Sequence, residues 1–408
     1  MAEREPSTIL CLSSQRWDEP LWTNKQHIMS RLAASHRVIH VDHGLRQLPG
    51  YLLDRLRRRP AEALLPVRLL TDGVARRHGS LYVAGSYAPP LLDLLPPGQP
   101  LRDFFEYDFK VRLLRRFLER ERITRPLLWV YHPGFAAALS RLPRELLIYD
   151  CVDNYAAFPA YRRSRPWLVE REERLCREAD LVFTTSRPLY EARRPLNPAN
   201  THLVHNVGDA AHFGLAMAEQ TAIPKDIIGL PGPRVGFVGA LSDYKLNQEW
   251  LIQLADRHPR WSVVLIGPVG LADASTEVNR LASRPNVHLL GPRAYADLPG
   301  YLKGFDVAVI PYRLNGYTES VFPIKFFEFL GSGKPVVVSD LPALAEYRHL
   351  VRVATTAEEF VRHCEASVAP GAAEQGREER LAAARENSWE SRIARIMAKV
   401  EEKLAIRG

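Results

Sequence analysis

The chain has 408 residues, of which 46% are hydrophobic and 25% are charged. These proportions are typical of globular proteins, so they exclude a mainly disordered, collagen-like or coiled-coil chain, and the length predicts two domains. The net charge of +8 is too modest to identify an anionic partner by itself. The apolar runs are far shorter than the roughly 18–20 residues of a membrane span. The first residues, MAEREPS, carry both acidic and basic side chains, whereas a secretory signal begins with a basic stretch followed by an apolar one. We therefore expect a cytoplasmic protein.

In the first half of the chain, short apolar runs alternate with helical segments. This alternation predicts a parallel sheet covered by helices on both faces. The expected strands are 8–13, 37–41, 80–83, 127–131, 146–152, 181–185 and 202–205. Two basic helical segments, 53–60 and 110–122, place arginines beside an apolar stripe. Either an ordinary solvated helix or attachment to an anionic membrane surface explains them.

The second half of the chain repeats the pattern. Its expected strands are 235–239, 262–266, 287–290, 306–310, 335–339 and 351–354, with helices such as 247–257 and 323–330. The segment between the halves contains prolines and glycines but little periodicity, which is typical of a linker. We therefore predict Rossmann-like domains over residues 1–215 and 234–386, joined by a linker over 216–233.

The C-terminal segment, 387–408, is expected to be helical. Residues 389–404 (WESRIARIMAKVEEKL) place apolar side chains along one helix face, so this face should pack on a domain surface. We predict that the helix returns to the N-terminal domain.

The most informative segment runs from Asp306 to Pro342 and reads DVAVIPYRLNGYTESVFPIKFFEFLGSGKPVVVSDLP. It predicts a buried strand, a loop over 311–320, a helix that begins near Pro323, and a GSGKP turn before the next strand. Helix N-termini beyond the carboxyl ends of parallel strands present unpaired N–H groups to anions. Pro323 suits the first helical turn because its missing N–H would be unpaired there. The loop before this helix can therefore hold a diphosphate.

Lys325 and Glu328 stand three residues apart on this predicted helix, so they share one face. As a surface ion pair they would contribute under about 1 kcal/mol. Their position after the loop favours a different interpretation. A lysine can neutralise a phosphate, and a carboxylate can accept hydrogen bonds from the two ribose hydroxyls.

This segment resembles the nucleotide-sugar-binding region of GT-B-fold glycosyltransferases, particularly the family 4 group and its relatives in bacterial surface-polysaccharide synthesis. In that group a glutamate, seven intervening residues and a second glutamate precede a small-residue turn and a PVV strand. Aligning on GSGKPVVVSD places the second glutamate at Glu328. Ser320 then stands at the first position, between the Thr318–Glu319 pair and the helix. The resemblance implies that these residues bind the donor.

A second segment, VGFVGALSDYK over 235–245, resembles the family's first C-terminal strand and loop. There a glycine, an arginine and a lysine approach the donor phosphates, which implies this role for Gly239 and Lys245. Ala240 stands where the arginine is usual, so Lys325 is the candidate to compensate. Taken alone, Lys245 would be interpreted as a solvated loop residue.

A third segment, VHLLGPRAYADLPGYLKGFD over 287–306, resembles the part of the family that contacts the nucleotide base. This resemblance implies that Arg293 and Tyr295 lie near the base. A solvent-facing loop arginine is an equally good interpretation of Arg293.

In the N-terminal half, the segments YHP (131–133) and YDCVDN (149–154) place polar groups at the same sheet edge. His132, Asp150 and Asp153 could orient the donor sugar or the acceptor hydroxyl. The alternatives are core packing by His132 and helix capping by Asp153. The second segment also looks like the YDxxDxxxxF pattern of surface-polysaccharide glycosyltransferases. HNVGD at 205–209 resembles the family's NGVD turn, which we interpret as structural.

The segment after the first strand, SSQRWDEPLWTNKQH, lacks the glycine-rich loop of many family members. Gln15, Arg16, Trp17 and Asn24 could bind acceptor or phosphate there instead. The sequence contains no D-x-D pair and no CxxC pair, so we expect neither a metal nor a separate cofactor, and we expect reduced thiols.

The resemblance implies a GT-B fold, two Rossmann-like domains that face each other across a cleft, with the C-terminal helix crossing back. It further implies a retaining, metal-independent glycosyltransferase that moves a sugar from a nucleotide-diphosphate sugar to a sugar, lipid-linked or small-molecule acceptor. No motif indicates nucleic acid. Contact with the inner face of the membrane follows if the acceptor is lipid-linked.

Two rival functions remain open at this point. One is a sugar-nucleotide 2-epimerase of the same architecture. The other is a degenerate, non-catalytic nucleotide-binding protein, which Ser320 and Ala240 suggest. If the enzyme instead inverts the anomeric configuration, His132 or Asp153 would be the candidate general base.

Overall fold

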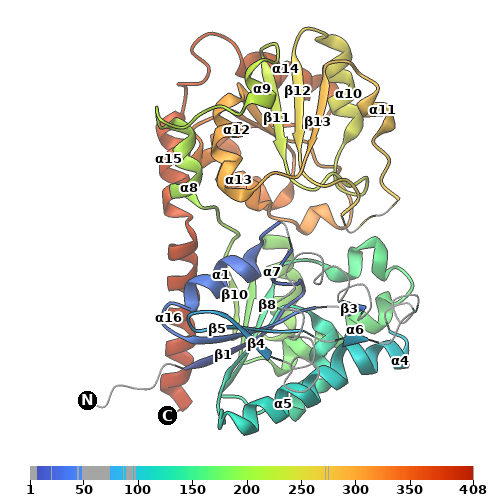
Figure 1. Ribbon diagram of the computed structural model, residues 1–408, viewed down its shortest axis with the longest axis vertical. Coiled ribbons are helices and arrows are strands. Elements are labelled where there is room, and N and C mark those ends of the chain that lie inside the picture. Colours follow the sequence, from blue (N-terminus) through green and yellow to red (C-terminus); the bar gives the residue numbers. More distant parts are fainter. Residues whose placement is uncertain are drawn as a thin grey trace, which may run out of the picture. The chain divides into compact units, whose positions relative to one another are not determined.

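The computed structural model describes residues 7–19, 21–43, 46–47, 74–85, 87–88, 95, 98–271, 273 and 275–407. The chain divides into two compact units, which are coloured along the sequence in Figure 1. Unit 1 consists of Met1–Thr184, Leu189–Leu203 and Ile396–Gly408, and unit 2 consists of Thr185–Pro188 and Val204–Arg395. The basic segment 53–60 lies outside the described residues.

Unit 1 is built on a sheet whose strand order is β10-β9-β8-β7-β1-β2-β5-β4. Its strands are β1 (Thr8–Leu12), β2 (Arg37–Val41), β4 (Val74–His78), β5 (Leu81–Ala84), β7 (Leu127–Val130), β8 (Leu146–Cys151), β9 (Leu181–Thr184) and β10 (Thr201–Leu203). All neighbours are parallel except β4, which is antiparallel to β5. The sequence did not predict β4, because its residues VARRH lack a run of apolar side chains. A separate short pair joins β3 (Arg46–Gln47) to β6 (Tyr87–Ala88).

The central strands of unit 1 bury nearly every side chain, which is the pattern of a parallel sheet covered on both faces. Its helices are α1 (Asn24–Leu32), α4 (Pro100–Asp103), α5 (Lys110–Arg120) and α6 (Arg165–Glu178), and α7 (Arg187–Arg193) leads out of β9. A π-helical turn over Phe104–Phe109 separates α4 from α5. On α5, Val111, Leu114 and Phe117 enter the core, while the arginines face solvent, as the sequence pattern indicated.

Unit 2 is built on an all-parallel sheet with strand order β13-β12-β11-β14-β15-β16. The strands are β11 (Arg234–Val238), β12 (Ser262–Ile266), β13 (Val287–Gly291), β14 (Val307–Ile310), β15 (Val336–Ser339) and β16 (Arg352–Ala354). The helices are α8 (Ala210–Gly214), α9 (Lys225–Ile228), α10 (Gln248–Arg257), α11 (Asn279–Ala282), α12 (Leu298–Gly304), α13 (Ile324–Gly331), α14 (Ala357–Ser367) and α15 (Arg377–Glu386). Figure 1 shows α10 and α11 beside β12 and β13, and α13 packs against α8 and α15.

The segment expected to be a linker, 216–233, belongs to unit 2 and packs on α12. Ile227 is fully buried, and a Cβ on Gly304 would lie 2.4 Å from its Cδ1. The Lys303 ammonium donates hydrogen bonds to the carbonyls of Ala218 (2.7 Å) and Glu219 (3.0 Å). The division along the chain therefore falls between Leu203 and Val204, earlier than the prolines and glycines of this segment suggested.

The last helix, α16 (Trp389–Arg407), is continuous, and its residues from Ile396 onward belong to unit 1. Within unit 2 the buried Arg392 donates a hydrogen bond to the Val204 carbonyl (2.5 Å). Within unit 1 the Lys403 ammonium donates to the Asn200 side chain (2.7 Å), and Arg407 donates to the Glu145 carbonyl (2.7 Å). The amphipathic helix thus returns the chain to unit 1, as predicted.

All four cysteines are free and buried, which agrees with the expected reduced thiols. Among the described residues, no helix is both long enough and apolar enough to cross a membrane.

Candidate functional site

In the sheet of unit 2, the order in which the chain adds strands reverses between β11 and β14. The chain runs outward from β11 through β12 to β13, returns to β14 on the other side of β11, and continues to β15 and β16. In open α/β sheets, ligands bind beyond the carboxyl ends of the strands at such a reversal. The loops that follow β11 and β14 carry Lys245 and the 3-10 turn Thr318–Ser320, so the predicted donor residues lie where the topology favours a ligand.

These two loops are joined by an antiparallel bridge between Leu246 and Tyr312. The Arg313 N–H donates to the Lys245 carbonyl (2.8 Å), and the Asn315 amide donates to the Tyr244 carbonyl (2.6 Å). The Lys245 ammonium lies 4.8 Å from the centre of the Tyr312 ring. Lys245 is therefore held beside the loop after β14, rather than projecting from an independent loop.

Gly239 follows β11 directly and approaches the next strand end very closely. Its N–H donates to the Ile266 carbonyl (2.8 Å). A Cβ on Gly267, whose φ is +144°, would lie 1.9 Å from the Gly239 carbonyl oxygen. The two glycines thus allow a bare backbone at this sheet edge, which suits a close phosphate.

The loop between β14 and α13 is held by its own side chains. The buried Thr318 hydroxyl accepts a hydrogen bond from the Asn315 N–H (3.0 Å) and donates to the Arg313 carbonyl. Glu319 is exposed, and the Ser320 carbonyl accepts from the buried Ser186 hydroxyl (2.7 Å). Thr318 therefore shapes the loop, while Glu319 remains accessible.

Pro323 is the N-cap of α13, one residue before the position that the sequence suggested. Two residues after this cap, the Lys325 ammonium lies 2.5 Å from the Glu328 carboxylate. The Lys325 side chain is 18% exposed and that of Glu328 only 1%. A Cβ on Gly208 would lie 2.7 Å from the Glu328 backbone nitrogen, so the 205–209 turn packs directly on α13. Such burial distinguishes this pair from an ordinary solvated ion pair.

Arg293 contacts the segment 216–233 that packs on α12, and Tyr295 contacts α8. Arg293 forms an ion pair with Asp226 (2.9 Å) and donates to the Tyr301 hydroxyl (2.7 Å). The Tyr295 ring stacks on His212, with 4.4 Å between ring centres, and its carbonyl accepts from the His212 ring (2.8 Å). These contacts show that both residues have a structural role. That they also lie near the nucleotide base of the donor stays a prediction.

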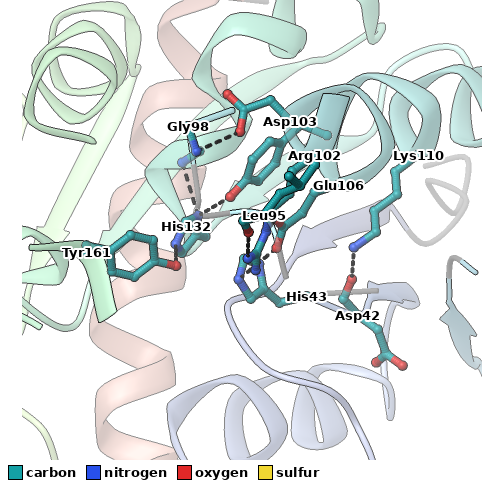
Figure 2. A network of polar contacts seen from close by, with 12 residues as sticks. Asp42, His43, Leu95, Gly98, Arg102, Asp103, Glu106, Lys110, His132 and Tyr161 are labelled. Atoms are coloured by element: carbon teal, nitrogen blue, oxygen red, sulfur yellow. Dashed lines mark hydrogen bonds and ion pairs between the residues drawn. The ribbon is translucent and has the colours of Figure 1, made fainter. Parts of the chain in front are cut away.

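Unit 1 has its own reversal, between β1 and β7, and a buried polar cluster lies beyond it. Figure 2 shows His43 and His132 side by side within this cluster, with Glu106 and Arg102 next to them. The centres of the two histidine rings are 4.3 Å apart. His132 follows β7 and His43 follows β2, the two strands that flank β1, so the ends of strands on either side of β1 bring them together.

The His132 ring is 1% exposed, and both of its nitrogens are engaged. Nδ1 accepts from the Gly134 N–H (3.1 Å), so the ring proton lies on Nε2, which donates to the Tyr161 hydroxyl (2.8 Å). Burial, and then the neighbouring His43, hold the pKa of His132 well below its usual value. The ring therefore caps the 3-10 turn Pro133–Arg141, which favours the structural alternative for His132. Asp153 is half-buried, and its role stays a prediction.

Sequence reasoning missed His43 and Glu106. The His43 Nε2 lies 3.4 Å from the Glu106 carboxylate, which also accepts from the Arg102 Nε (3.1 Å). Burial, and then the charge of Lys110, lower the pKa of His43 to about 3. Glu106 lies on the π-helical turn FFEYDF, where acidic residues among aromatic ones were the available signal.

The residues after β1 that were considered for acceptor binding are used to fix the loop. Thr23 donates to the Gln15 side chain, and the Trp17 N–H donates to the Asp42 carboxylate (2.8 Å). Arg16 pairs with Glu19 (3.2 Å). Across the described ranges, no group of three or more His, Cys, Asp or Glu side chains could hold a metal ion.

Unit 2 contains a segment that matches a known protein family. Residues 232–369 match the family model described as "Glycosyl transferases group 1". The chain is also 29% identical over 282 residues, covering 66% of this chain and 70% of the relative, to the putative teichuronic acid biosynthesis glycosyltransferase TuaH of Bacillus subtilis (strain 168). Neither is described as an epimerase, so that alternative has no support here.

Solved structures show the same fold over nearly the whole chain. Sucrose-phosphate synthase from Thermosynechococcus elongatus has a TM-score of 0.69 at 17% identity, covering 98% of this chain and 100% of that one. Anabaena Alr3699/HepE in complex with UDP and glucose has a TM-score of 0.66 at 16% identity, covering 97% and 99%. The E. coli trehalose-6-phosphate structure bound with UDP-2-fluoro glucose has a TM-score of 0.70 at 12% identity, covering 96% and 98%. These likenesses confirm the predicted GT-B fold.

Proposed function

We propose that this chain, a GT-B-fold glycosyltransferase, transfers a sugar from a UDP-sugar to an acceptor hydroxyl during the synthesis of a bacterial surface polysaccharide. The observation that carries the proposal is the buried Lys325–Glu328 pair at the start of α13, next to the joined loops that hold Lys245. The uridine nucleotides in the HepE and E. coli structures support the donor class. The description of TuaH supports the polysaccharide context.

In this proposal, Lys245 and Lys325 contact the donor diphosphate from the loop after β11 and from α13. Departure of the nucleoside diphosphate builds negative charge on the leaving oxygen, and two fixed cations stabilise that charge. Glu328 accepts hydrogen bonds from the ribose hydroxyls. The lysines would supply the charge that a metal supplies in other glycosyltransferases, so the reaction would be metal-independent, and we propose that it retains the anomeric configuration.

A direct test begins with a thermal-shift panel of nucleotides and nucleotide sugars, because a ligand that binds only the folded state raises its melting temperature. UDP and UDP-sugars should give the largest shifts. The preferred donor is then incubated without acceptor, with and without EDTA. Slow release of UDP in both samples supports the proposal, whereas binding without any turnover would favour the non-catalytic alternative that Ser320 and Ala240 suggest.

A further inference from the structure

Two buried side chains donate hydrogen bonds to the stretch of chain that leads into α13. The Ser186 hydroxyl donates to the Ser320 carbonyl (2.7 Å), and the Asn206 amide donates to the Phe322 carbonyl (2.7 Å). Ser186 is fully buried and Asn206 is 5% exposed. Both accepting carbonyls come shortly before Pro323, the N-cap of α13. The peptide groups before this helix are therefore fixed by side chains from two other segments of unit 2.

The bond from Ser186 is made to a carbonyl that the loop itself leaves unused. The Ser320 N–H donates to the Tyr317 carbonyl (3.1 Å), and the Val321 N–H donates to the Thr318 carbonyl (3.1 Å). These bonds close the 3-10 turn, but neither of them involves the Ser320 carbonyl. A buried carbonyl without a donor is unfavourable. The hydroxyl of Ser186 therefore both satisfies this carbonyl and sets the direction of its peptide group.

The segment Thr185–Pro188, which contains Ser186, belongs to unit 2, although the chain before and after it belongs to unit 1. It is held within unit 2 on both sides of Ser186. The carbonyl of the preceding residue accepts from the His205 Nδ1 (3.3 Å), and the following residue, Arg187, forms an ion pair with Glu346 (2.7 Å). The Ser186 hydroxyl thus acts from a fixed backbone.

The residues that follow the braced stretch are those assigned above to the donor. Lys325 lies in the first turn of α13 and Glu328 in the second. A change in the direction of the chain before the N-cap would displace both side chains together, since they lie on one helix. Binding groups that are misplaced by about 1 Å can lose about a hundredfold in rate. The direction of the Ser320 peptide group therefore matters for groups that Ser186 does not touch.

We propose that Ser186 is a positioning residue for donor binding, whose hydroxyl holds the Ser320 carbonyl and thereby fixes the start of α13. This inference rests on the glycosyltransferase function proposed above. It adds a residue that lies outside the segment 232–369 matched by the family model. Ser186 acts through the loop and itself contacts neither the nucleotide nor the sugar.

The test compares Ser186→Ala with a matched control, Ser262→Ala. Ser262 is 1% exposed and its hydroxyl also donates to a backbone carbonyl at 2.7 Å, that of Pro231. Both variants lose one buried hydrogen bond, so both should melt at a lower temperature than the wild type. Only Ser186→Ala should weaken UDP binding and raise the KM for the donor in the hydrolysis assay, each by about fivefold.

The KM distinguishes positioning from a general loss of stability. Unfolded protein lowers the apparent kcat but leaves the KM of the folded fraction unchanged, so the assays are run well below both melting temperatures. Wild-type protein without UDP binding and donor hydrolysis would overturn the proposed function, and with it this inference. Wild-type turnover with an unchanged Kd and KM in Ser186→Ala would overturn the role of Ser186 alone. Equal losses of UDP affinity in both variants would overturn that role as well.

Discussion

The Lys325 ammonium lies 2.5 Å from the Glu328 carboxylate on the same face of α13, but the two side chains differ sharply in exposure, 18% for the lysine and 1% for the glutamate. The lysine is therefore the end of the pair that an incoming ligand reaches first. A diphosphate that attracts Lys325 would release a lone pair of the buried carboxylate, which then requires new donors. Ribose hydroxyls are such donors, so one ion pair can couple recognition of two parts of a nucleotide.

Alanine at Lys245 or Lys325 should weaken binding of UDP much more than binding of uridine, since each lysine is assigned to the diphosphate. A hydrogen bond to a charged group contributes roughly 1.5–3 kcal/mol, which corresponds to about tenfold or more in affinity. Calorimetric titration of both ligands into each variant measures this difference. Equal losses for UDP and uridine would point to a general distortion of the loops instead.

Gly267→Ala should destabilise unit 2 and reduce UDP affinity, because the added Cβ would lie 1.9 Å from the Gly239 carbonyl. The clash can be relieved only by moving the backbone at the end of β11 or β12, which is the predicted phosphate position. Gly229→Ala serves as the control, since a Cβ there meets nothing within 4 Å. Urea unfolding of both variants should separate them clearly, and a wild-type unfolding midpoint for Gly267→Ala would contradict the packing described.

The buried Asn206 amide donates to the Phe322 carbonyl (2.7 Å), just before the N-cap of α13. Asn206→Ala leaves this carbonyl unpaired, which should cost about 1–3 kcal/mol of stability, and should also weaken UDP binding by loosening the start of α13. Asn286→Ala is a matched control, because its buried amide donates to carbonyls far from the loop, including that of Ala255 (3.1 Å). The control should lose stability and keep its UDP affinity.

Much of the fold follows from sequence because parallel strands such as β12 (SVVLI) are buried on both faces and are therefore recognisable as short apolar segments. Glu328 and Lys245 were predicted as donor-binding residues from the resemblance of their segments to those of GT-B glycosyltransferases, and that role stays a prediction. The contact of His43 with Glu106 could not be predicted from sequence, since it joins a strand end to a π-helical turn far along the chain.

His43 predicts how stability depends on pH. Its folded pKa of about 3 lies below the usual 6.5, so below pH 6.5 the unfolded chain binds a proton that the folded protein refuses. The free energy of unfolding should therefore fall on acidification, by up to about 1.4 kcal/mol per pH unit for this residue. Urea unfolding at pH 7.5, 6.0 and 5.0 should show a shallower fall for His43→Gln, and identical slopes would refute the burial of a neutral ring.

The central claim is that unit 2 binds the nucleotide of the donor through Glu328, and Glu328→Gln tests it most directly. Glutamine keeps the shape of the side chain but loses the negative charge and replaces one acceptor oxygen with a donor. Calorimetry with UDP and thermal unfolding are measured on the same variant. Loss of a charge-assisted bond, about 1.5–3 kcal/mol, predicts at least tenfold weaker UDP binding with the fold retained. A lower melting temperature with unchanged UDP affinity would instead show that Glu328 serves only to pair with Lys325.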